Sequence, residues 1–107
     1  MSSFDEREQG FERKFQHDQE LAFKARARRN RLFGLWIAEH LGLSGEGAQA
    51  YARDFVEADA VKRADDRLIA KAADDLARKK VNFDAARLRV ELDRFAAEAK
   101  RQVEGSR

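Results

Sequence analysis

Cysteine and proline are both absent from this sequence, and glycine is sparse, with six residues among 107. The absence of cysteine excludes disulfides and thiolate metal sites, and the absence of proline leaves no helix interrupted by a missing N–H donor. No apolar run approaches the ~20 residues that span a bilayer, and the first residues lack the apolar core of a signal peptide. We therefore expect a cytoplasmic protein without direct membrane insertion.

Charged and helix-forming residues dominate what is present. Charged residues make up 39% of the chain and hydrophobic residues 43%, and Ala, Glu, Lys, Leu and Arg together prevail. This composition is typical of helical proteins. The isoelectric point of about 9.1 overstates the basicity, because the formal net charge is only +2. Such a small excess is weak support for a nucleic-acid partner, and we expect none.

Apolar residues recur at intervals of three and four in the segments 19–41, 45–58 and 61–79 and in the stretch after Asp84. Four amphipathic helices with short connections predict an all-α fold, an antiparallel four-helix bundle over residues 19–107. Gly42 is a candidate left-handed helix stop, and Ser44 and Asp84 are candidate caps. No glycine or proline marks the boundary between the second and third helices.

The same spacing predicts which side chains form the core of the bundle. In the first bundle helix the stripe consists of Leu21, Ala25, Leu32, Trp36 and Leu41, with Phe33 and Ile37 beside it. In the third helix it consists of Val61, Ala64, Leu68, Ala72 and Leu76. Many of these positions are alanine, so we expect closely packed helices around a thin core.

The segment before the bundle has a different character. Phe4, Phe11 and Phe15 are spaced at seven and four residues, so they share one face of a helix. Gly10 weakens that helix by roughly 1 kcal/mol relative to alanine, and short isolated helices are marginal in water. We therefore predict that residues 1–18 are frayed or disordered when free and fold on a partner. The alternative is that they form the first turns of a core helix packed within this domain.

The sequence contains no pattern typical of a catalytic or metal site. His17 and His40 are 23 residues apart, without ligand-spaced carboxylates around either. The acidic pairs 65–66 and 74–75 lie among Lys and Arg, which favours salt-bridging faces over paired catalytic carboxylates. The glycines at 45 and 47 lack the length and the lysine of a phosphate-binding loop. We predict neither enzyme activity nor a metal or cofactor.

A basic stretch over residues 24–31 allows two interpretations. It contains Lys24, Arg26, Arg28, Arg29 and Arg31. Lys24, Arg28, Arg29 and Arg31 are the candidates for anion contact, so one interpretation is a nucleotide- or nucleic-acid-binding bundle. Helical spacing spreads the cations around the axis, however, which favours a solvated face that pairs with acids of the third and fourth helices.

A long, chemically mixed run in the first third of the chain resembles the zeta subunit of the alphaproteobacterial ATP synthase. The run consists of Phe4-Asp5-x-Arg7-Glu8, Lys14-Phe15-x-His17-Asp18-x-Glu20-Leu21 and Phe23-Lys24-Ala25-x-Ala27-Arg28-Arg29-Asn30-Arg31-Leu32-x-Gly34-x-Trp36. Leu41-Gly42-Leu43-Ser44-Gly45 and Tyr51-Ala52 extend it. After Asp59 the resemblance is weak, because the family has an acidic, proline-containing connection where this chain has Ala60-Val61-Lys62-Arg63-Ala64.

The resemblance implies a four-helix bundle with a mobile N-terminal inhibitory segment. It further implies that this segment inserts as a helix between an alpha and a beta subunit, near the gamma subunit, and blocks ATP hydrolysis. The implied contact residues are Phe4, Asp5, Arg7, Glu8, Phe11, Lys14 and Phe15. The implied location is the cytoplasm, peripheral to the inner membrane through ATP synthase, and the family is also associated with weak nucleotide binding.

Overall fold

The computed structural model describes the backbone of residues 3–105, and the side chains of residue 10 and of residues 12–105. Over that range the chain forms the helices α1 (Ser3–His40), α2 (Gly45–Val61), α3 (Asp65–Arg78) and α4 (Ala85–Gly105). No β-strand occurs among these described residues. The prediction of an all-α, four-helix fold is therefore confirmed.

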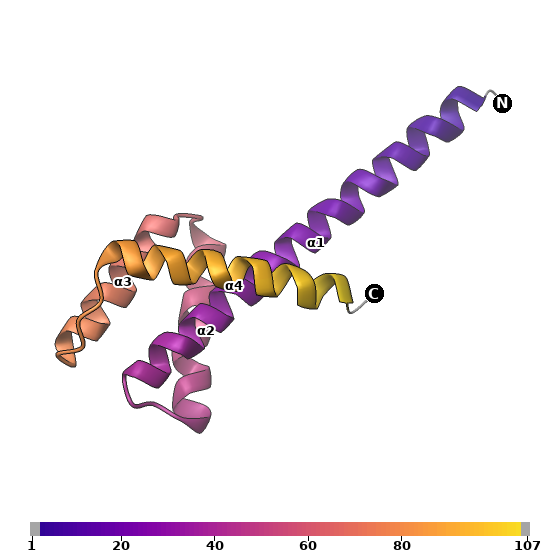
Figure 1. The fold of residues 1–107 in the computed structure, drawn as a ribbon. Helices are drawn as coiled ribbons and strands as arrows, with labels where there is room; N and C mark the ends of the chain where they lie inside the picture. The colour runs from indigo at the N-terminus through magenta and orange to yellow at the C-terminus, as the bar shows by residue number, and fades with distance from the viewer. Residues whose placement is uncertain (1–2, 106–107) are drawn as a thin grey trace.

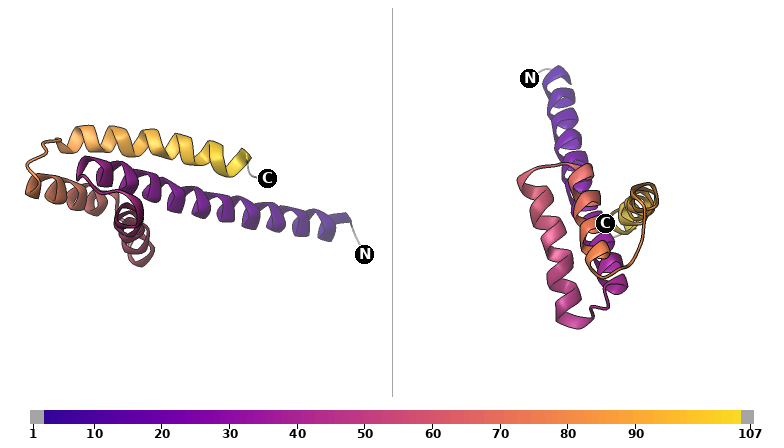
Figure 2. Two further views of the ribbon diagram at one scale, coloured as in Figure 1. Left: turned by 90° about the horizontal axis from the view of Figure 1, so that it is seen from below. Right: turned by 90° about the vertical axis from the view of Figure 1, so that its left-hand side faces the viewer.

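Helix α1 is the element around which the others are arranged (Figure 1). Helix α2 folds back across its C-terminal half, and α4 runs alongside it in the opposite direction, as Figure 2 shows. The short α3 packs on α4 at the end of the molecule far from the N-terminus. With 38 residues, α1 is much longer than α4, which has 21, so its N-terminal part extends beyond the bundle. The resulting molecule is elongated, measuring 66 × 26 × 22 Å.

Two of the three predicted helix-end residues act as expected. Gly42 adopts a left-handed conformation with φ of +80°, and the N–H of Leu43 donates to the carbonyl of Ala38 at 2.9 Å. The Asp84 carboxylate accepts a hydrogen bond of 2.8 Å from the N–H of Arg87 and so caps α4. Ser44 occupies the N-cap position of α2, but its side chain makes no capping hydrogen bond.

The boundary between α2 and α3 lies later than the sequence pattern predicts. Val61 is the last residue of α2 and is 89% exposed, so the prediction that it opens the third helix and faces the core is wrong. The break consists of extended backbone at Lys62 and Ala64, with φ of −148° and −159°. Its position is set by Asp59, which is buried and holds the end of α2 against α1. A polar anchor therefore replaces the glycine or proline that usually marks such a boundary.

The core lies where α1, α2, α3 and α4 meet. Its buried members are Phe33, Ile37, Phe55, Leu68, Ile69, Ala72, Leu76, Leu88 and Leu92. On α1 the most deeply buried side chains are Phe33 and Ile37, whereas Leu32 and Trp36 of the predicted stripe are half-buried. The buried face of α1 is thus turned about the helix axis relative to the predicted stripe. Helices α2 and α4 pack on two sides of α1, and the face of α1 between them is the most completely buried.

Candidate functional site

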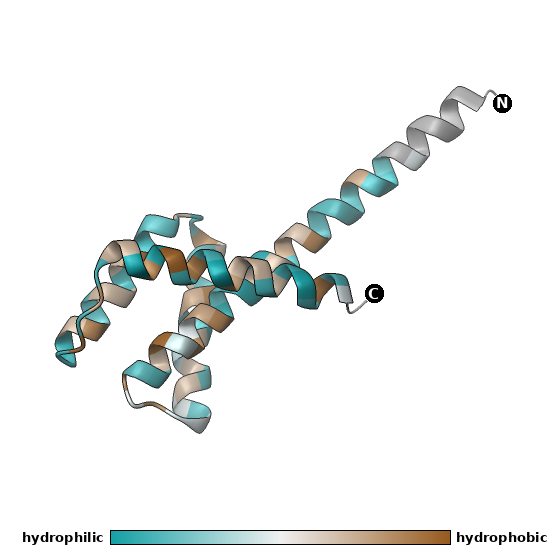
Figure 3. Ribbon diagram, viewed as in Figure 1, coloured by the Kyte–Doolittle hydropathy of each residue, from teal (hydrophilic) through white to brown (hydrophobic). Residues whose placement is uncertain are grey.

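The N-terminal part of α1 projects beyond the other helices (Figure 1). Val103 and Glu104 in the last turn of α4 line one groove together with Asp18 and Leu21 of α1. Every described side chain from Glu12 to Glu20 is exposed. In Figure 3 hydrophilic residues cover most of the coloured part of this projection, while hydrophobic residues gather where the helices meet. We call residues 3–18 of α1 the extension.

The division of the chain at residue 18 stays a prediction, since no break in the helix marks it. Helix α1 is continuous from Ser3 to His40. That residues 1–18 order only on a partner stays a prediction. Because the extension continues a helix whose other half is anchored in the bundle, it needs no separate helix nucleus.

Phe15 continues the buried face of α1 into solvent. Phe15 and Phe33 are 18 residues apart, which at about 3.6 residues per turn is five full turns, so both point to the same side of the helix. Phe33 is 0% exposed in the core, whereas Phe15 is 56% exposed. The extension therefore carries an aromatic side chain in line with the core, at a point where α2 and α4 no longer cover it.

The other predicted contact residues fall into two groups. Lys14 lies beside Phe15 on the exposed part of the extension. The backbone at the remaining five positions is helical, but their side chains lie outside the described ones: Phe4, Asp5, Arg7, Glu8 and Phe11. Among these, Phe4 and Phe11 are related to Phe15 only by their spacing in the sequence.

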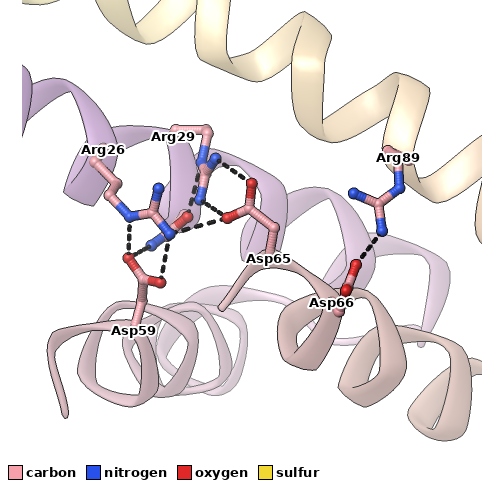
Figure 4. Close-up of polar contacts among 7 residues, drawn as sticks. Arg26, Arg29, Asp59, Asp65, Asp66 and Arg89 are labelled. Atoms are coloured by element: carbon pink, nitrogen blue, oxygen red, sulfur yellow. Dashed lines mark hydrogen bonds and ion pairs between the residues drawn. The ribbon is translucent and has the colours of Figure 1, made fainter. Parts of the chain in front are cut away.

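A charged cluster ties α1 to α2 and α3 just inside the bundle (Figure 4). The Arg26 guanidinium donates to both carboxylate oxygens of Asp59, at 2.6 and 2.8 Å, and to Asp65 at 2.9 Å. Arg29 donates to Asp65 at 2.9 Å, and the Asn30 amide donates to Asp59 at 2.8 Å. The hydrogen bond from Arg26 lowers the pKa of Asp59, and that from Arg29 lowers the pKa of Asp65, both below the ordinary carboxyl value.

This cluster changes the interpretation of the basic stretch. Arg29 is only 8% exposed, and it forms an ion pair with Asp65 of α3. This agrees with the predicted pairing between the basic stretch and acids of the third helix. The second acid, Asp59, comes from α2, so the predicted pairing with the fourth helix is wrong. The exact positions of these acids depend on where α2 ends, which the sequence pattern did not reveal.

The remaining cations of the basic stretch form one face. Lys24, Arg28 and Arg31 are spaced at four and three residues, and all three are exposed. Arg31 donates to the Gln49 side chain at 3.0 Å, while Lys24 and Arg28 make no ion pair or hydrogen bond with any side chain that the structure describes. The prediction that helical spacing scatters the cations is wrong for these three, which we call the basic stripe.

An open groove of about 430 Å³ separates α1 from the C-terminal half of α4. Its floor is mainly apolar, formed by Leu21, Ala25 and Val103 together with other small side chains. The groove begins at the end of the extension, since Asp18 is among its lining residues.

His40 and Asp75 have structural partners. His40 packs against Trp36 and Phe83, with ring centroids 4.5 and 5.0 Å away. Asp75 accepts a hydrogen bond of 2.6 Å from the Tyr51 hydroxyl, and burial raises the pKa of that tyrosine. Within the described part of the chain, no group of three or more His, Cys, Asp or Glu side chains is arranged to hold a metal ion.

Together, the bundle and the extension define a small helical protein that presents an uncovered helical face to a partner. The sequence model of the family described as ATPase inhibitor subunit zeta matches residues 1–102, and the chain therefore belongs to that family. The resemblance found in the first third of the sequence is thus confirmed over nearly the whole chain. No curated protein and no solved structure matches the chain.

Family membership assigns an inhibitor role and implies association with ATP synthase. It also indicates a protein that acts by binding and not by catalysis. Among the helices that the structure describes, none has both the length and the hydrophobicity required to cross a membrane.

Proposed function

We propose that the extension is the inhibitory element, and that it inserts as a helix between an alpha and a beta subunit of ATP synthase, near gamma, to block ATP hydrolysis. The observation that carries this proposal is the exposed aromatic face of α1, in which Phe15 continues the line of the buried Phe33. The proposed contacts are Phe4, Asp5, Arg7, Glu8, Phe11, Lys14 and Phe15. The protein then acts in the cytoplasm, peripheral to the inner membrane through ATP synthase.

The mechanism is that of a helix docked in a groove. Aromatic side chains at one face of the helix fill apolar pockets of the partner, while polar side chains on the other faces fix its orientation. The extension spans 16 residues, or about 24 Å at 1.5 Å per residue, so it can reach well past the surface of the bundle. Rotation requires the subunits around the catalytic interface to move, and a helix wedged there prevents that movement.

The anchored half of α1 supports this mechanism in a physical sense. A free peptide of this length would have to nucleate a helix, which is unfavourable in water. Here the bundle already fixes the turns that follow, so binding requires only that the helix propagate toward the N-terminus. The ordering of residues 1–18 still opposes binding, which is why glycine at position 10 matters for affinity.

Replacement of one exposed phenylalanine tests the proposal. Phe15→Ala in the full-length protein removes an apolar anchor, and we expect inhibition of ATP hydrolysis by the cognate catalytic head to weaken at least about tenfold. Phe23→Ala is the matched control, because Phe23 is similarly exposed, at 59%, but lies on another side of α1 and after the extension. Equal inhibition by the Phe15 variant and the unmodified protein would rule out the proposed face.

A further inference from the structure

The basic stripe is a row of three exposed cations on α1, a short way along the helix from the extension. Elsewhere in the bundle some arginines are paired with nearby acids, as in Arg78 with Asp75 and Arg94 with Glu91, while others, such as Arg67, are exposed without an ion pair among the described side chains. On α1 the inward-facing Arg26 and Arg29 are paired as well. Lys24 and Arg28 have no such acid among the described side chains. The inward-facing cations of α1 are therefore compensated, whereas those of the stripe lie in one exposed row on the same helix as the extension.

Helix stability does not account for this arrangement. Lys24 and Arg28 are four residues apart, and like charges at that spacing destabilise a helix by roughly 0.2–0.5 kcal/mol. A glutamate at either position would form a favourable pair instead. The stripe is also not required for packing, since all three of its side chains are exposed. An external negative partner would explain why three cations share this face.

We propose that the basic stripe docks on an acidic protein surface of the catalytic head, so that the bundle helps to steer and hold the inserted extension. The inference rests on the proposed function. The stripe begins six residues after the extension ends, or about 9 Å further along the same helix. Lys24 is nine residues from Phe15, which is two and a half turns, so the stripe faces away from the aromatic side. A partner that surrounds the helix therefore meets both faces.

The shape of the stripe favours an acidic protein surface over a bound phosphate. Phosphate sites bring several donors to one point, commonly with backbone N–H groups at a helix N-terminus. Lys24, Arg28 and Arg31 instead lie along about 11 Å in the middle of α1, where the backbone N–H groups are used within the helix. A row of separated cations matches a row of carboxylates on a helix or strand of the partner. Complementary charge of this kind chiefly raises the rate of association.

Charge reversal of the stripe in the full-length protein tests the inference. The test variant is Lys24→Glu/Arg28→Glu/Arg31→Glu, and the control variant Arg53→Glu/Arg67→Glu/Lys79→Glu changes the net charge equally at exposed positions on α2 and α3 and at the end of α3. The association rate constant with the cognate catalytic head is measured from low to high ionic strength, alongside inhibition of ATP hydrolysis. Thermal unfolding verifies that both variants remain folded.

We expect the stripe variant to associate at least about tenfold more slowly at low salt, with the difference shrinking toward 0.5 M salt, and the control to change by less than about twofold. Equal rates for the two variants would overturn the inference while leaving inhibition by the extension intact. Unchanged association together with lost binding of ATP or polyphosphate would overturn it in favour of a phosphate ligand. Failure of the unmodified protein to bind and inhibit the head would overturn the proposed function and this inference together.

Discussion

At the scale of single residues, Asp59 has the largest structural consequence. Its carboxylate accepts hydrogen bonds from Arg26 and Asn30, and it is only 5% exposed. Its removal leaves the buried Asn30 amide without its acceptor and leaves the part-buried Arg26 with Asp65 alone. We predict that Asp59→Ala lowers the free energy of unfolding by about 2–4 kcal/mol, measured by urea denaturation. Asp66→Ala is the control, because the Asp66 side chain is 88% exposed in its pair with Arg89 and should contribute less than about 1 kcal/mol. Similar losses for both variants would contradict this role for Asp59.

The same cluster predicts how stability depends on pH. The pKa values of Asp59 and Asp65 are lowered in the folded protein by their arginine partners. The folded state therefore holds these protons less tightly than the unfolded chain, so the stabilisation is complete above the unfolded carboxyl pKa of about 3.9. It is lost as the pH falls from there through the lowered folded-state values.

We therefore expect the urea midpoint to fall as the pH drops below about 4, and the fall to be shallower in Asp59→Asn, which has one titrating group fewer in the cluster. Urea denaturation of both proteins at several pH values measures this. The same dependence on pH in the variant and the unmodified protein would show that Asp59 does not contribute to the acid sensitivity.

At the scale of helices, the contact between α1 and α2 depends on Gly34. A methyl group at this position would lie 2.8 Å from the Cα atom of Ala52 and 2.9 Å from the Phe55 ring. We predict that Gly34→Ala destabilises the protein by about 1–2 kcal/mol, because overpacking exceeds the gain in helix propensity. Thermal or urea unfolding measures the effect. An increase in stability would show that the two helices separate easily.

For Gly10 we expect the opposite effect of an alanine substitution. No atom lies within 4 Å of a side chain added there, so Gly10→Ala gains helix propensity without a clash. We predict that the extension of this variant is more helical. Since its backbone then loses less conformational entropy on binding, inhibition should be up to about fivefold stronger. Gly47→Ala is the control, since it makes the same exchange in an open position of α2. Circular dichroism and inhibition assays of both variants separate an effect on the extension from a general gain in stability.

Sequence periodicity predicted the number and type of helices but not all of their packing. Spacings of three and four residues identify amphipathic helices wherever one face is buried, and capping residues such as Asp84 mark their ends. The end of α2 was missed because it is fixed by Asp59, whose partners are 29 and 33 residues away in the sequence. The precise core face of α1 was missed because one helix is covered by two neighbours, which no local pattern specifies.

At the scale of the whole molecule, the sequence predicted the family. The aromatic spacing around Phe15 and the mixed motif of the first third were sufficient for that. The basic stripe was not predicted, because Arg26 and Arg29 lie between its members in the sequence. Only their ion pairs with Asp59 and Asp65 show that these two arginines face inward. The structure thus gives α1 an anchored half with an outer basic face and a projecting half on which Phe15 is exposed.

Amide hydrogen exchange of residues 3–20, in the free protein and in complex with the cognate catalytic head, tests the central claim most directly. The extension has no covering helix in the free protein, so its amides should exchange quickly there, whereas the anchored half of α1 is protected. In the complex, we predict strong new protection across the extension, together with inhibition of ATP hydrolysis. New protection confined to the bundle, with rapid exchange throughout residues 3–18, would contradict the claim that the extension is the inhibitory element.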